Sequence, residues 1–252
     1  MIRTDRLSSA FVVVAQPRSG STLLSMALHA HPGIVCHDEL FSRDFVHGYR
    51  PKESLEPQAA NGVLATQLLE ERSSDPEKFL FERVFAVGPR LQVGFKVVYS
   101  DLFAGTETSQ FLRSFLIESR IRVIHLRRLN MLRCFLSVER MRRLGITHSN
   151  QPGQKSCGRL HLDLRDFTRF IVSQDNNCDL VARSMNIIAN PRYENLPQGY
   201  NKVLDALGVL RRPFVEHLAR LSDQSLSELV EDVELFRPFD FPRLPGFAAY
   251  TD

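Results

Sequence analysis

Cysteine is scarce in this chain of 252 residues, and its four cysteines are widely separated. No two of them form a Cys-x-x-Cys pair, and their spacing matches no zinc-binding pattern. They are Cys36, Cys134, Cys157 and Cys178. Scattered thiols of this kind are typical of a reducing compartment. We therefore expect free cysteines in a cytoplasmic protein and no structural metal.

Long hydrophobic runs are also absent. The longest apolar stretches, such as Phe11–Ala15, are far shorter than the ~20 residues that a membrane-spanning helix needs. The first sixteen residues, "MIRTDRLSSAFVVVAQ", hold too short an apolar stretch for the core of a signal peptide. The sequence therefore predicts a soluble protein that is not exported and does not span a membrane.

Charge of one sign is not in large excess, because 32 Lys and Arg oppose 29 Asp and Glu. A net charge of +3 does not indicate a nucleic-acid partner. The basic residues are nevertheless unevenly placed, with nine Arg in residues 113–143 against Glu118 and Glu139. Arginine suits bidentate contact with phosphate or sulfate oxygens. A solvated basic face is the alternative explanation of this run.

Apolar segments alternate with helical patterns along the chain, and there are no internal repeats. This order predicts one α/β domain over residues 1–252, with a three-layer arrangement of a mainly parallel sheet flanked by helices. We expect a flexible N-terminus at 1–10 and two excursions on the substrate side, at 42–90 and 145–160. The expected strands are 11–15, 92–100 and 122–126, with a strand-like stretch at 186–193. The main expected helices follow residue 21 and cover 106–118, 130–144, 163–184, 197–208 and 224–235.

The first strand runs into a turn and helix, "QPRSGSTLL", that is suited to an anion. A helix N-terminus presents unpaired N–H groups and the positive end of the helix dipole. Gly20 lets the backbone approach a ligand closely. Arg18 adds a positive charge, and Ser19, Ser21 and Thr22 add hydroxyl groups. The turn lacks the Gly-Lys pair of an ATP- or GTP-binding loop. A plain helix capped by Ser21 or Thr22 is the simpler alternative.

Taken with later segments, this turn resembles the sulfotransferases that use 3′-phosphoadenosine-5′-phosphosulfate (PAPS). The turn and the following "HPGIVCHDELF" are similar to the family's 5′-phosphosulfate loop and the segment after it. A strand ending in Arg and a helix carrying Ser resemble its 3′-phosphate motif. The resemblance extends from Phe11 to about Arg237, and the bacterial branch with the trehalose and nodulation-factor enzymes is most similar. Its other segments are "VGFKVVYSDL", "RVIHLRRLNMLRCFLSVE", "PRYENLPQGYNKVLDALGV" and "QSLSELVEDVELFR".

The resemblance implies a P-loop-like sulfotransferase fold with PAPS as donor co-substrate and no metal. It places the 5′-phosphosulfate on the loop from Arg18 to Leu23, and gives Arg18 a second, catalytic role at the departing oxygen. It assigns the 3′-phosphate to Arg128 and Ser137. These two residues lie one position further apart than is usual in the family, so Arg127 remains an alternative to Arg128.

A transferred sulfuryl group needs a base for the acceptor hydroxyl. The segment "CHDELF" offers His37, Asp38 and Glu39, and the resemblance implies Glu39 as the base. Taken alone, three adjacent titratable residues are more typical of a solvated loop. His125, in a buried strand, and His148, in the second excursion, are weaker candidates.

Two further features have structural explanations as well as functional ones. Lys96 lies inside an expected strand, where it either points into a cleft or packs its stem at a strand end. Tyr193 and Glu194 are expected to fasten the last strand to its neighbours rather than to contact substrate.

The sequence thus favours a sulfotransferase that acts on an acceptor hydroxyl by in-line displacement. A hydroxyl of a carbohydrate or glycolipid is the first expectation, followed closely by another small alcohol or a phenol. A P-loop-like kinase or phosphotransferase and a non-catalytic nucleotide-binding module are the alternatives. The oligomeric state stays open, with a homodimer as the commonest assembly.

Overall fold

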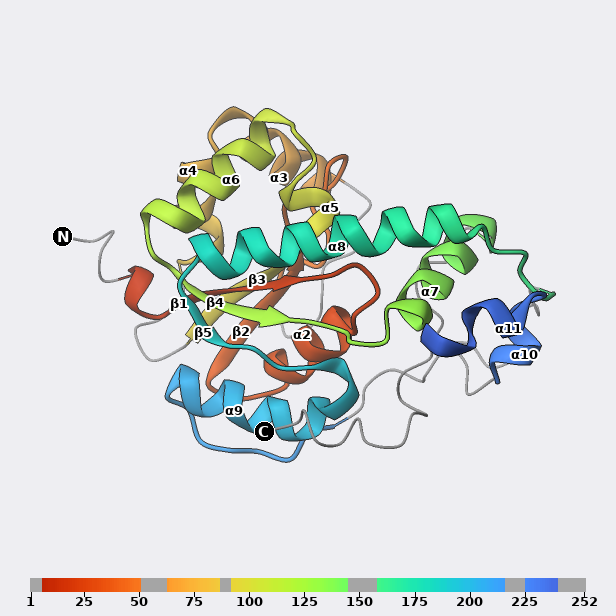
Figure 1. Ribbon diagram of the computed structural model, residues 1–252. Coiled ribbons are helices and arrows are strands. Elements are labelled where there is room, and N and C mark those ends of the chain that lie inside the picture. Colours follow the sequence, from red (N-terminus) through yellow and green to blue (C-terminus); the bar gives the residue numbers. More distant parts are fainter. Residues whose placement is uncertain (1–5, 51–62, 87–91, 145–157, 216–224, 240–252) are drawn as a thin grey trace.

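The computed structural model describes residues 6–50, 63–86, 92–144, 158–215 and 225–239 (Figure 1). These residues form a five-stranded sheet of order β2-β3-β1-β4-β5 in which every pair is parallel. The predicted parallel sheet is therefore confirmed. The strands are β1 (Ala10–Ala15), β2 (Ile34–Glu39), β3 (Gln92–Val98), β4 (Arg122–Leu126) and β5 (Ile187–Ala189).

Helices cover both faces of the sheet, as Figure 1 shows. One face carries α3 (Val63–Ser74), α4 (Pro76–Phe79), α6 (Glu107–Glu118) and part of α8 (Leu164–Ser184). The other face carries α2 (Ser21–His29) and α9 (Leu196–Leu207). To one side of the sheet, α7 (Met131–Leu144), α10 (Leu226–Leu229) and α11 (Val233–Phe236) pack with the start of α8. The arrangement is the predicted three-layer α/β architecture.

The central strand β1 explains the two cores. Val12 and Val14 face the core beneath α3, α4 and α6, whereas Phe11, Val13 and Ala15 face the core beneath α2 and α9. All five side chains are fully buried. Side chains alternate between the faces of a strand, so only a continuous apolar run satisfies both cores.

Several boundaries differ from the prediction. The strand β2 was not expected, because its second half, "HDE", is polar. The expected helix at 224–235 is divided into α10 and α11, because the backbone of Val230 pairs with that of Leu160. Most of the expected excursion at 145–160 lies outside the described residues.

Two element boundaries also lie earlier in the sequence than expected. Ala10, in the segment expected to be flexible, is already the first and fully buried residue of β1. The strand expected at 92–100 ends at Val98, because the short helix α5 (Tyr99–Leu102) begins there.

The sheet topology places two loops side by side. β1 pairs with β4, and Ala15 is opposite Leu126, so the loops that follow these strands leave the sheet at neighbouring positions. β2 and β3 lie on one side of β1, and β4 and β5 lie on the other. The chain thus adds strands first on one side of β1 and then on the other. Ligands of open parallel sheets bind at the carboxyl ends of the strands, at the point where the strand order reverses in this way.

Candidate functional site

The loop after β1 has a backbone that few residues adopt. Arg18 has φ 60° and Gly20 has φ 83°, and Gly20 is the N-cap of α2. A Cβ atom at Gly20 would lie 2.5 Å from Cδ2 of Tyr193. Glycine is therefore required both by the backbone and by the packing. The cap is not Ser21 or Thr22, which belong to the first turn of the helix.

The first turn of α2 supplies the N–H groups that an anion needs. The first helical hydrogen bond is donated by Leu24 N–H to the Gly20 carbonyl over 3.0 Å. The N–H groups of Ser21, Thr22 and Leu23 precede this bond, so they have no partner within the helix. The loop thus leads into the N-terminus of a nine-residue helix, a kind of terminus that suits an anion.

Two of the loop hydroxyls are already used by the protein. Ser19 is fully buried, and its Oγ donates to the Gln16 carbonyl over 2.6 Å. Thr22 Oγ1 accepts from Lys96 Nζ over 2.5 Å. Ser19 therefore fixes the shape of the loop, and Thr22 ties the helix to β3.

The two predicted motifs meet at Arg18. Its Nε donates to Ser137 Oγ on α7 over 2.9 Å, although the residues are 119 positions apart. Burial lowers the pKa of Arg18, and Arg128 adds to this effect, while Cys134 and Glu39 oppose it. The guanidinium of Arg18 thus lies within the electrostatic reach of both motifs and of Glu39.

Arg128 is built into the same loop. Its Nη1 donates to the Arg18 carbonyl over 3.1 Å, and its backbone N–H donates to Gln16 Oε1 over 2.7 Å. The guanidinium carbon lies 4.5 Å from the ring centre of Tyr193. Arg128 Nε is buried and has no hydrogen-bond partner within the described part of the chain. This arginine therefore keeps one donor that the described part of the chain does not use.

Arg127 faces a different region. Its Nε donates to Asn190 Oδ1 over 3.1 Å, and its Nη1 contacts Cys178 Sγ of α8 at 3.6 Å. The structure thus brings Arg128, Ser137 and the loop together and turns Arg127 away from them.

The segment after β5 completes this side of the site. Glu194 Oε1 accepts the backbone N–H groups of Leu129 and Asn130 over 3.0 Å each, immediately before α7 begins. Tyr193 lies against Gly20 and Arg128. Glu194 therefore has the fastening role expected of it, whereas Tyr193 also forms a wall of the loop. Sequence reasoning missed this role of Tyr193 and that of Gln16, because both depend on contacts distant in sequence.

On the β2–β3 side of the loop, Lys96 is the central residue. Its Nζ is 2.7 Å from Asp38 Oδ1 and 3.0 Å from Glu39 Oε1, and its side chain is 1% exposed. β3 lies between β2 and β1, so this is not an edge-strand lysine. Burial lowers the pKa of Lys96, but the two carboxylates outweigh it and raise the pKa overall. Lys96 therefore links both carboxylates to Thr22 of the loop.

The two carboxylates differ in exposure. Glu39, the last residue of β2, is 26% exposed, whereas Asp38 is 7% exposed. Burial alone would raise the pKa of Asp38, but Lys96 and His47 outweigh it and lower the pKa to about 2. Asp38 is thus a permanent partner of Lys96, and Glu39 is the carboxylate open to a ligand.

The histidines are structural. His37 Nδ1 accepts the Arg50 N–H over 3.0 Å, and burial lowers its pKa to about 3. His125 is hydrogen-bonded to the Tyr99 hydroxyl, and burial lowers its pKa to about 4. His148 lies outside the described residues. The solvated-loop alternative is therefore wrong for His37 and Asp38, which are both buried.

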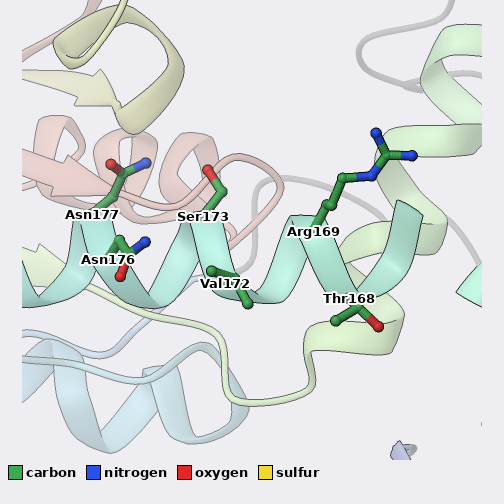
Figure 2. A pocket seen from close by; sticks show the side chains of 6 residues that line it. All are labelled: Thr168, Arg169, Val172, Ser173, Asn176 and Asn177. Carbon is green, nitrogen blue, oxygen red and sulfur yellow. The ribbon is translucent and has the colours of Figure 1, made fainter. Parts of the chain in front are cut away.

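A separate hollow of about 410 Å³ lies on the outer side of α8, and its lining differs from that of the candidate site (Figure 2). Its one charged side chain, Arg169, is paired with Asp166 at 2.6 Å. It contains none of the predicted site residues. The others that line it are Thr168, Val172, Ser173, Asn176 and Asn177.

The described ranges contain no helix with the length and apolar character to cross a membrane. They also contain no group of three or more His, Cys, Asp or Glu side chains that could hold a metal ion.

Comparisons with known proteins return a distant structural likeness. No protein-family model matches the chain, and no curated protein matches it. Among solved structures, a sulfotransferase from Alicyclobacillus acidocaldarius is similar with a TM-score of 0.49 and 15% sequence identity. The likeness covers 91% of this chain and 90% of that one.

Proposed function

We propose that this protein is a sulfotransferase that moves a sulfuryl group from PAPS to an acceptor hydroxyl. The observation that carries the proposal is the hydrogen bond from Arg18 to Ser137, with Arg128 bonded to the same loop. A loop suited to a 5′-phosphosulfate and an Arg–Ser pair suited to a 3′-phosphate thus form one basic site.

The residues present fit this donor. The N–H groups at the start of α2 and the Arg18 guanidinium would hold the 5′-phosphosulfate. Arg128, with its unused buried Nε, and Ser137 would hold the 3′-phosphate. An unpaired buried donor costs about 1–3 kcal/mol, so a ligand oxygen at that position is favourable.

Glu39 is proposed as the base. When bound, the donor supplies a sulfuryl group on a phosphate oxygen that leaves readily. Glu39 is the more exposed of the two carboxylates beside the loop, so it accepts the proton of the acceptor hydroxyl as the new oxygen–sulfur bond forms. Arg18 and the helix terminus stabilise the charge on the departing oxygen. Lys96 keeps Glu39 and Thr22 in fixed positions.

A direct assay tests this function against its alternatives. The protein is incubated with PAPS and a panel containing a glycoside, a disaccharide, a simple alcohol and a phenol. We expect adenosine 3′,5′-bisphosphate and one acceptor whose mass has increased by one sulfuryl group. Phosphorylation of an acceptor by ATP and Mg²⁺, with no transfer from PAPS, would instead establish a kinase. Tight nucleotide binding with neither product would establish a binding module.

Arg128 should determine recognition of the 3′-phosphate. In Arg128→Ala we expect the preference for adenosine 3′,5′-bisphosphate over adenosine 5′-phosphate to fall about tenfold or more, because a charge-assisted hydrogen bond is worth about 1.5–3 kcal/mol. Isothermal titration calorimetry measures both affinities, and any general disturbance of the loop cancels in their ratio. Arg127→Ala is the matched control, since Arg127 contacts Asn190 and Cys178. A reduced ratio in Arg127→Ala alone would reverse the assignment.

A further inference from the structure

A small cavity with polar and apolar walls adjoins the turn that follows Glu39, and it is not used by the proposed chemistry. Its volume is about 60 Å³, and it is bounded by the turn after β2 and by the segment from α5 to the start of α6. A water molecule occupies about 30 Å³ in the liquid, so the cavity has room for one or two non-hydrogen groups. Its lining residues are Phe41, Arg43, Asp101, Ala104, Thr106 and Thr108.

Asp101 and Arg43 are the charged residues that line this cavity. Burial and the charge of Glu39 raise its pKa to about 6, while the Arg43 backbone N–H, Arg72 and Lys96 oppose the rise. β2 and β3 are neighbouring parallel strands with Glu39 opposite Lys96, and Phe41 and Asp101, which follow these two strands, both line the cavity. Asp101 is therefore at the same end of the sheet as the proposed base, in a partly desolvated position.

The cavity offers donors as well as acceptors. Thr106 Oγ1 accepts the Ser109 N–H over 3.2 Å as the cap of α6, and this bond does not use the hydroxyl proton of Thr106. The Thr108 side chain lines the same cavity, and Phe41 supplies an apolar wall. Carboxylate, hydroxyl and apolar groups together match the edge of an uncharged polyol.

One wall of the cavity is held rigidly. Arg72 of α3 is 2% exposed, and its Nη1 donates to the carbonyls of Leu40, Ser42 and Phe45 over 2.8, 2.7 and 3.1 Å. These bonds fix the turn that carries Phe41 and Arg43 directly after Glu39. A preformed wall reduces the entropy that is lost when a ligand binds.

We propose that this cavity binds a second hydroxyl group of the acceptor, adjacent to the hydroxyl that Glu39 deprotonates, with Asp101 as the main contact. The inference rests on the proposed function, because it takes Glu39 as the base. It makes Asp101 a specificity-determining residue that favours acceptors with neighbouring hydroxyls over simple alcohols and phenols.

The test compares two acceptors that differ by one hydroxyl, trans-cyclohexane-1,2-diol and cyclohexanol. The wild type should give the higher kcat/KM with the diol. In Asp101→Asn, and to a smaller degree in Thr108→Val, this ratio should fall about tenfold through KM of the diol. Asp44→Asn is the matched control, since Asp44 is an exposed carboxylate in the neighbouring turn. A ratio unchanged in Asp101→Asn, or a wild type without preference for the diol, overturns the inference and leaves the proposed function standing.

A binding measurement keeps the inference testable if neither probe is sulfated. Saturation-transfer NMR is recorded for both probes with adenosine 3′,5′-bisphosphate present. The diol should receive more magnetisation than cyclohexanol from the wild type, and the difference should disappear in Asp101→Asn. Equal signals for the two probes with the wild type overturn the inference whatever the turnover. If no acceptor receives a sulfuryl group from PAPS although the diol still binds, the proposed function is contradicted instead.

Discussion

Replacing Glu39 by Gln is expected to slow sulfuryl transfer by about 10²–10⁴-fold, the usual loss when a positioned base is removed. Glutamine keeps the shape of the side chain and can still accept a hydrogen bond from Lys96 Nζ, which lies 3.0 Å from Glu39 Oε1. It cannot accept the acceptor's proton. The affinity for adenosine 3′,5′-bisphosphate should therefore remain, while kcat collapses. Single-turnover kinetics and calorimetry on the same preparation measure the two quantities.

The choice of control follows from the structure. Asp38→Asn is unsuitable, although it is the adjacent carboxylate, because Asp38 is the buried partner of Lys96. Asp44→Asn removes an exposed carboxylate a few residues further along, and it should keep most of the activity. If Glu39→Gln retains activity within a few-fold of the wild type, the base lies elsewhere. Asp101 would then be the next candidate, rather than His37, which is bound to backbone groups.

Replacing Lys96 by Met should destabilise the protein by about 3–5 kcal/mol at neutral pH. The change leaves the carboxylate of Asp38 buried without its counter-charge, and removing one partner of a buried ion pair typically has this cost. Denaturant unfolding monitored by circular dichroism measures the loss. Lys78→Met is the matched control, because Lys78 is 63% exposed and its pair with Glu82 spans 3.9 Å. We expect it to cost less than about 1 kcal/mol.

The pH dependence of this loss is a sharper test. In the wild type, the pKa of Asp38 is lowered from 3.8 to about 2, so its contribution to stability is present above about pH 4 and is lost as the pH falls through 2. Without Lys96, His47 alone opposes the effect of burial, so the pKa of Asp38 rises and the folded variant takes up a proton at a higher pH than the wild type does. The gap in unfolding free energy between wild type and variant should therefore narrow between pH 7 and about pH 5. A gap that is constant over this range would contradict the ion-pair account.

The sequence predicted the strands in which apolar residues dominate and missed β2, which ends in polar residues. β1 is a continuous apolar run that is buried on both faces, and β4 is mainly apolar and buried after its first residue. β2 ends in His37, Asp38 and Glu39, which are ordinary loop residues by composition. Its burial depends on Lys96, from a strand more than fifty positions later. A local pattern contains no information about such a distant partner.

The site shows the same division. The anion-binding turn is a local feature, since a strand, a glycine and a helix start are adjacent in sequence. The choice between Arg127 and Arg128 is not local, because the two side chains are chemically identical and only the contacts of Arg128 with Gln16, the Arg18 carbonyl and Tyr193 distinguish them. The role of Lys96 likewise required the sheet order, which places β3 between β2 and β1.

The proposed donor site is tested most directly by nucleotide binding to the unmodified protein. Isothermal titration calorimetry should show that adenosine 3′,5′-bisphosphate binds more tightly than adenosine 5′-phosphate, and more tightly than ATP with Mg²⁺. The preference follows from Arg128 and Ser137, which join the loop of Arg18 in one basic site. Tighter binding of ATP with Mg²⁺, or equal binding of the nucleotides with and without the 3′-phosphate, would contradict the PAPS-dependent account.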